Sequence, residues 1–243
     1  MSKEVVADNG QTSFELVIAD SDTALFQAAL AVEETYVIAT NKLTGVEREF
    51  KNVSTFRGVG KAVGGWIKDI NEFLGLSLTR DDFTESVRVR LKPDIKNHLA
   101  EAEKRFSYYV GSLKNLECAE DYRLCIGGEG NFRYQEAKIL PYKGDRKEKP
   151  IIFSELKDSV FKQYKNKVII TNGAESDDEL GMRGAENQAH FRRTGKYKYL
   201  ISYIDKDIKQ IWGPTYYLNK PELGVVFIEP FDAARHFAFQ LIK

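Results

Sequence analysis

Carboxylates are the side chains of this sequence whose types and spacing could do chemistry. Glu175, Asp177 and Asp178 lie in the segment ITNGAESDDELGMRG (170–184), which follows an apolar, β-branched run and begins a helical pattern. Acidic residues in a first helical turn can complement the positive end of the helix dipole, with Ser176 or Asp177 as the N-cap. The same carboxylates could instead bind divalent metal ions.

Two further apolar runs end in paired aspartates. FELVIA (14–19) and KYKYLISYI (196–204) have the composition of buried strands, and each is followed by two carboxylates. The four residues are Asp20, Asp22, Asp205 and Asp207. One alternative is structural, because Asp22, Ser21 or Thr23 could simply cap the helix predicted after the first run.

The order of these elements predicts the fold class. Four apolar runs, at 14–19, 122–126, 167–171 and 196–204, are each followed by polar or acidic residues, most of them with a helical pattern beyond. This order predicts an α/β fold with a mostly parallel central sheet flanked by helices. The carboxyl ends of parallel strands share one edge, so the seven carboxylates would meet there.

Seven neighbouring carboxylates repel one another unless cations neutralise them. Oxygen ligands without histidine or cysteine favour Mg²⁺ or Mn²⁺ over zinc. Two such ions, about 4 Å apart, are a known arrangement for phosphodiester hydrolysis. We therefore expect two divalent ions, held by Asp20, Asp22, Glu175, Asp177, Asp178, Asp205 and Asp207.

A second group of residues is basic and lies between the second and third of these runs. Its cations are Arg133, Lys138, Lys143, Arg146, Lys147 and Lys149, and Phe132, Tyr134 and Tyr142 are interleaved with them. Basic side chains position phosphates, and aromatic faces stack on bases. A solvated charged loop is the alternative interpretation of the same composition.

Other segments carry structural expectations. Residues 36–50 predict a β-hairpin, the glycine-rich segment 56–70 predicts a surface loop, and 93–116 predicts a helix. The segment 81–91 is ambiguous. Glu179 lies outside the Glu175, Asp177, Asp178 pattern, and we assign it to the helix surface.

Composition excludes several classes of protein. The 243 residues carry 36 Lys and Arg against 36 Asp and Glu, so bulk electrostatics alone would not bind nucleic acid. No apolar run reaches the roughly 20 residues of a membrane helix, which predicts no membrane partner. The two cysteines and three scattered histidines form no zinc motif, and we expect reduced thiols in a cytoplasmic compartment.

Five segments together resemble the bacteriophage 5′→3′ exonuclease and flap endonuclease family, which has a PIN-like, resolvase-like nuclease fold. They are IADSD (18–22), GNFR (130–133), LPYKGDR (140–146), GAESDDELG (173–181) and YIDKDIKQI (203–211). The resemblance implies one nuclease-like domain over 14–243, with a variable insertion at about 36–120, after a flexible N-terminus at 1–13.

The resemblance also implies roles for individual residues. Asp20 would be a metal ligand with Asp22 beside it, Glu175, Asp177 and Asp178 would form the acidic box, and Asp205 and Asp207 would bind the second metal. Lys143 and Arg146 would be catalytic contacts to the scissile or adjacent phosphate, and Arg133 and Lys147 would contact DNA.

The implied substrate is DNA with free 5′ ends, flaps, nicks or branches, cut in the cytoplasm of an infected bacterial host. Two departures from the family stand out. Gly127 and Gly128 replace a usual aspartate, for which Glu129 is the nearest substitute, and the helix-hairpin-helix part expected after the last matched segment is missing, so a second polypeptide could supply it. A non-catalytic DNA-structure-binding accessory subunit and a PIN-like ribonuclease are the alternatives.

Overall fold

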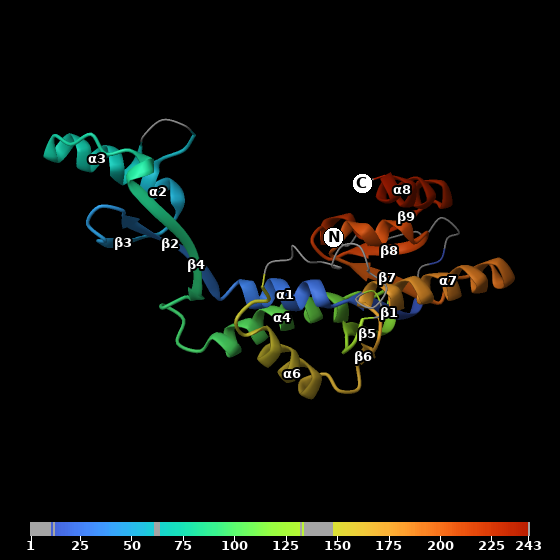
Figure 1. Ribbon diagram of the computed structural model, residues 1–243. Coiled ribbons are helices and arrows are strands. Elements are labelled where there is room, and N and C mark those ends of the chain that lie inside the picture. The colour runs from blue at the N-terminus through green and yellow to red at the C-terminus, as the bar shows by residue number, and fades with distance from the viewer. Residues whose placement is uncertain (1–10, 12, 61–63, 132, 134–147, 243) are drawn as a thin grey trace. The chain divides into compact units, whose positions relative to one another are not determined.

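The computed structural model describes residues 11, 13–60, 64–131, 133 and 148–242 (Figure 1). The chain forms two compact units, and each is described by itself. The main unit comprises Met1–Ala29 and Leu99–Lys243, and the small unit comprises Leu30–His98. The small unit overlaps the insertion expected at about 36–120, but residues 99–120 belong to the main unit.

The main unit contains a six-stranded sheet with the strand order β6-β5-β1-β7-β8-β9. Its strands are β1 (Phe14–Asp20), β5 (Ala119–Gly127), β6 (Val168–Thr171), β7 (Tyr199–Tyr203), β8 (Gly213–Tyr217) and β9 (Val225–Ile228). All neighbouring pairs are parallel except β8 and β9, which are antiparallel. This arrangement confirms the predicted α/β fold with a mostly parallel sheet flanked by helices, and it is consistent with a PIN-like fold.

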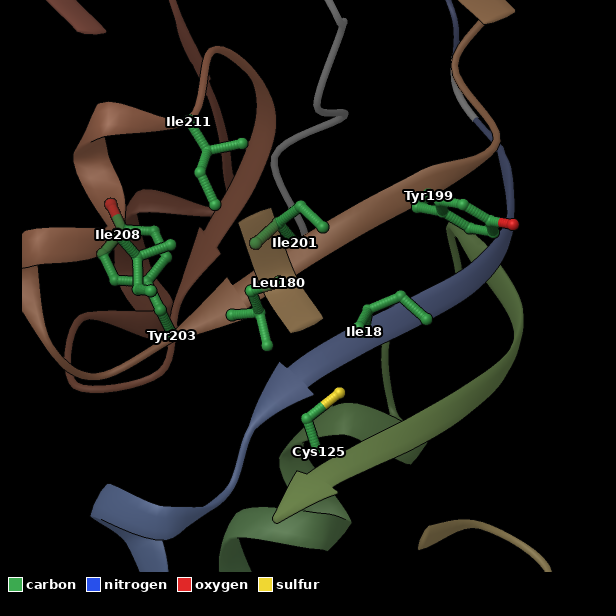
Figure 2. Packing of buried hydrophobic residues seen from close by; sticks show 8 residues of the cluster. All are labelled: Ile18, Cys125, Leu180, Tyr199, Ile201, Tyr203, Ile208 and Ile211. Carbon is green, nitrogen blue, oxygen red and sulfur yellow. The ribbon is translucent and has the colours of Figure 1, made fainter. Parts of the chain in front are cut away.

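Helix α7 (Ser176–Thr194) covers one face of this sheet and packs against β1, β5 and β7. The buried side chains between them are shown in Figure 2 and comprise Ile18, Cys125, Leu180, Tyr199, Ile201, Tyr203, Ile208 and Ile211. Burial of Leu180 from the helix against these strand residues fixes the position of the acidic segment at the start of α7. The thiol of Cys125 is enclosed in this cluster, and burial raises its pKa, so that it stays protonated.

Residues that alternate with this cluster along the strands are buried on the opposite face of the sheet. Val17, Leu124 and Leu200 are all 1% exposed or less. Helices α1 (Asp22–Leu30), α4 (His98–Lys114) and α6 (Phe153–Gln163) pack on one another through ring and hydroxyl contacts. Among its described residues the unit also contains two 3₁₀ helices, η2 (Lys206–Gln210) and η3 (Pro221–Leu223), and the helix α8 (Pro230–Ile242).

The small unit has a three-stranded antiparallel sheet with the order β3-β2-β4. Its elements are β2 (Glu33–Asn41), β3 (Glu47–Phe50), α2 (Val53–Arg57), α3 (Gly65–Leu74), η1 (Arg80–Asp82) and β4 (Phe83–Leu91). The predicted hairpin is confirmed by the pairing of β2 with β3. The core is largely aromatic: the ring centroid of Phe56 lies 5.1 Å from that of Phe50 and 5.4 Å from that of Phe83.

Three local expectations change. The glycine-rich segment 56–70 is helical in part, because α3 begins at Gly65 and its apolar residue Ile67 is buried. The ambiguous segment 81–91 forms η1 and β4. Strand β8 was not expected. None of the helices within the described ranges has both the length and the apolar character required to cross a membrane.

Candidate metal and nucleic-acid site

Asp20 is the last residue of β1, and its side chain is almost fully enclosed, with 1% of the residue exposed. Its Oδ1 accepts hydrogen bonds from the Ser176 hydroxyl at 3.0 Å and from the backbone N–H of Asp22 at 3.2 Å. Its Oδ2 accepts one from the Thr23 hydroxyl at 3.1 Å. Asp20 therefore joins β1 to the first turns of both α1 and α7.

The charge on Asp20 is costly at this position. Burial, together with the negative charges of Asp177 and Asp22, raises the pKa of Asp20 to about 7. The carboxylate of Asp22 does not cap α1 but accepts the backbone N–H of Gly127 at 2.9 Å, across the edge of the sheet. Asp20, Asp22 and Asp177, three of the carboxylates expected at the strand ends, therefore lie close enough for their charges to interact.

The acidic segment begins α7, with Glu175 rather than Ser176 or Asp177 as the N-cap. Asp178 Oδ2 accepts the backbone N–H of Glu175 at 2.9 Å, which stabilises this helix end. Asp178 stabilises the helix end, and the negative charge of Asp177 acts on Asp20. The helix-capping role of this segment is therefore compatible with the metal-site interpretation.

Arg133 is the basic residue that the structure places against these carboxylates. Its Nη1 and Nη2 donate to Asp178 Oδ2 and Oδ1 at 2.7 and 2.6 Å, and its Nη1 lies 3.7 Å from Glu175 Oε2. The backbone N–H of Arg133 donates to Asn131 Oδ1 at 2.9 Å. Arg133 was expected to contact phosphate, and in this structure its guanidinium pairs with two of the expected metal ligands.

Asp205 and Asp207 follow β7, the strand that pairs with β1 on the side away from β5. Asp205 is exposed and caps η2, because its Oδ1 accepts the backbone N–H of Asp207 at 3.1 Å. The pair lies at the expected edge of the sheet. The neighbouring charges that raise the pKa of Asp20, however, are those of Asp177 and Asp22.

Two residues near this edge behave differently from expectation. Glu179 is buried rather than on the helix surface, with 7% exposed, and it pairs with Arg183 at 2.7 Å. Lys157 of α6 was not singled out, yet its Nζ donates to the carbonyl oxygen of Gly127, next to Asp22. No pattern in the sequence signals this lysine, because the contact depends on how α6 packs beside β5.

The predicted phosphate contacts Lys143, Arg146 and Lys147 lie outside the described residues.

The acidic side chains have the right chemistry for a hard divalent cation. All are oxygen donors, and a cation would relieve the repulsion that Asp22 and Asp177 impose on Asp20. Within the described part of the chain, no three acidic, histidine or cysteine side chains are grouped closely enough to hold an ion together. The donor types fit Mg²⁺ or Mn²⁺, and the present side-chain arrangement engages Glu175 and Asp178 with Arg133 instead.

The structure explains why glycine occupies positions 127 and 128. A Cβ on Gly127 would lie 2.8 Å from Asp22 Oδ2, and one on Gly128 would lie 2.2 Å from Asn172 Oδ1. The exposed Glu129 ties this loop to the next one through its backbone, because its carbonyl oxygen accepts the N–H of Gly173 at 2.8 Å. Glycine thus allows the two strand-end loops to approach.

Gly128→Ala is expected to destabilise the chain by about 1–3 kcal/mol, because the new methyl group would displace Asn172 and Ile170. Urea denaturation with circular dichroism measures the change. Gly181→Ala is the matched control, since a Cβ there meets nothing within 4 Å inside α7, and a gain of about 0.5–1 kcal/mol is expected. Equal effects of the two substitutions would contradict the close approach.

A scan against protein-family models, a search of curated proteins and a search of solved structures each gave no match for this chain.

Proposed function

We propose that this protein is a metal-dependent 5′ nuclease that hydrolyses DNA phosphodiester bonds from free 5′ ends or at 5′ flaps. The observation that supports this most is the buried Asp20 at the carboxyl end of β1, with its pKa raised to about 7 beside Asp22 and Asp177. Burial disfavours the anionic form of this carboxylate, and a bound cation would offset that cost.

In this proposal the chain supplies ligands and orientation. Asp20, Asp22 and Asp177 would hold one ion after their side chains move closer together, and Asp205 with Asp207 would contribute at the neighbouring strand end. Bound Mg²⁺ or Mn²⁺ would supply an activated water and neutralise charge at the leaving oxygen. The hydroxyl of Ser176 orients Asp20 by donating to its Oδ1. Lys143 and Arg146 would contact the phosphate, as the family resemblance implies.

Cleavage of end-labelled DNA tests the proposal. The purified chain is incubated with 5′-flap, nicked and blunt duplexes, and with an RNA strand, in Mg²⁺, Mn²⁺ or EDTA. We expect DNA products whose formation requires the metal and is lost in Asp177→Ala. Intact DNA under all metal conditions would refute the nuclease, and cleavage of RNA alone would instead indicate a ribonuclease.

A second candidate is a non-catalytic subunit that binds DNA structures. The observation that favours it is the ion pair of Arg133 with Asp178, which engages part of the expected metal site. This candidate predicts DNA binding without hydrolysis, and binding that Asp205→Ala leaves unchanged. A mobility-shift titration with the same flap substrate, run beside the cleavage assay, separates the two candidates.

A further inference from the structure

Arg133 forms a bidentate ion pair with Asp178. Both terminal nitrogens of its guanidinium donate to the two oxygens of Asp178, at 2.7 and 2.6 Å, and Glu175 lies 3.7 Å away. Planar guanidinium groups bind carboxylates most strongly in this two-bond geometry. The three side chains are only 23–30% exposed, so water screens the interaction less than at an open surface.

The position of Arg133 is set by its own loop. Asn131 accepts its backbone N–H, and the loop is tied to the β6–α7 turn because the carbonyl oxygen of Glu129 accepts the N–H of Gly173. These contacts hold the backbone next to Arg133 near the turn that leads into α7.

Asp178 has little capacity left for another ligand. Its Oδ2 accepts both an Arg133 hydrogen and the N–H of Glu175, and its Oδ1 accepts a second Arg133 hydrogen. A carboxylate offers about four lone-pair sites, and these contacts use at least three of them. A cation that binds Asp178 must therefore compete with Arg133.

We infer that Arg133 is a positioning residue that competes with the divalent ion: it holds Glu175 and Asp178 in the metal-free chain and is displaced from them when metal binds. This inference rests on the proposed function, and it adds Glu175 and Asp178, which the sequence predicts as metal ligands, to the residues that would hold the ion. Its consequence is that Arg133 lowers the affinity of the site for metal. The displaced guanidinium is then available to bind a phosphate group.

Arg183 provides a matched comparison on the same helix. It also pairs with two carboxylates, Glu179 at 2.7 Å and Glu186 at 3.1 Å. Neither of these partners belongs to the expected metal site. Loss of either arginine removes an ion pair from α7, but only Arg133 is expected to change metal binding.

The experiment measures binding of Mn²⁺ alone to the full chain, by electron paramagnetic resonance of the free ion. Arg133→Gln, Arg133→Lys and Arg183→Gln are compared with the wild type. We expect the Kd for Mn²⁺ to fall about tenfold in Arg133→Gln. Arg133→Lys, which keeps the charge but not the two-bond geometry, should lie in between, and Arg183→Gln should match the wild type.

Unchanged or weaker Mn²⁺ binding in Arg133→Gln overturns the inference. If the wild type then still cleaves DNA in Mn²⁺, the proposed nuclease stands and only the role of Arg133 fails. If the Kd falls tenfold in Arg133→Gln but neither the wild type nor any variant cleaves DNA, the role of Arg133 stands and the proposed nuclease fails. Equal shifts in Arg133→Gln and Arg183→Gln also overturn the inference, because they point to a general loosening of α7.

Discussion

Asp20→Asn is expected to abolish DNA cleavage and, in the same protein, to raise the free energy of unfolding at pH 8. The loss of a buried metal ligand should reduce the cleavage rate by more than about a hundredfold. Stability should rise because the amide is nearly the same size, still accepts the Ser176 hydroxyl and the Asp22 N–H, and carries no charge to bury. Few substitutions are expected to change activity and stability in opposite directions so strongly.

The pH dependence of this effect follows from the raised pKa. The folded chain keeps a proton on Asp20 up to about pH 7, whereas the unfolded chain releases it near pH 4. The contribution of Asp20 to stability is therefore fully present below about pH 4 and is lost as the pH rises to 7. A shift of about three pKa units corresponds to at most about 4 kcal/mol, so the gain in Asp20→Asn should be largest at pH 8 and small at pH 4.

Urea denaturation in EDTA at several pH values measures this gain, and cleavage of a flap substrate in Mg²⁺ measures the activity. Asp205→Asn is the control. Because Asp205 is exposed, this variant should lose activity without gaining stability. Cleavage by Asp20→Asn at the wild-type rate would mean that Asp20 has only a structural role. If the stability difference between Asp20→Asn and the wild type did not change with pH, the hydrogen bonds of Asp20 would offset the effect of burial on its pKa.

Phe56→Ala is expected to destabilise the small unit by about 3–5 kcal/mol. Phe56 is 1% exposed, and its ring centroid lies 5.1 to 6.5 Å from those of Phe50, Trp66 and Phe83. Alanine would leave a cavity at the centre of this aromatic core. A unit of this size buries too little apolar surface to absorb such a loss easily.

Hydrogen exchange measured by mass spectrometry locates the effect. Amide protection should fall in β2 and β4, while β1 and β5 keep theirs. Phe73→Ala is the control, since this phenylalanine of α3 is 83% exposed and its loss should change stability by no more than about 0.5 kcal/mol. Loss of protection in both units would show that they unfold together.

Much of the fold could be predicted from the periodicity of apolar residues. The runs that became β1 and β7 are apolar, and the structure buries all of β7 and most of β1, so the sequence pattern and the structure agree. Strand β8 could not be predicted in the same way, because its residues Gly213 and Pro214 are unusual in a strand. Helix α3 was obscured by Gly64 and Gly65, although Trp66 to Leu74 has a helical pattern.

The candidate site could be predicted as a set of residues but not as a set of contacts. Strand ends indicated where Asp20 and Asp22 lie, since the edge of a parallel sheet follows from topology. The choice of Asp178 as the partner of Arg133, and the burial of Glu179, depend on distances between segments far apart in the chain. Such pairings are set by tertiary packing, and local spacing holds no information about them.

The close approach at Gly127 makes residues 22 and 127 epistatic. The N–H of Gly127 donates to Asp22 Oδ2, and a Cβ on Gly127 would lie 2.8 Å from the same oxygen. An aspartate cannot be introduced at position 127 by a single replacement without displacing the Asp22 carboxylate. A side chain at position 127 would require a second change at position 22. If the two changes were made one at a time, the single variant would be less stable.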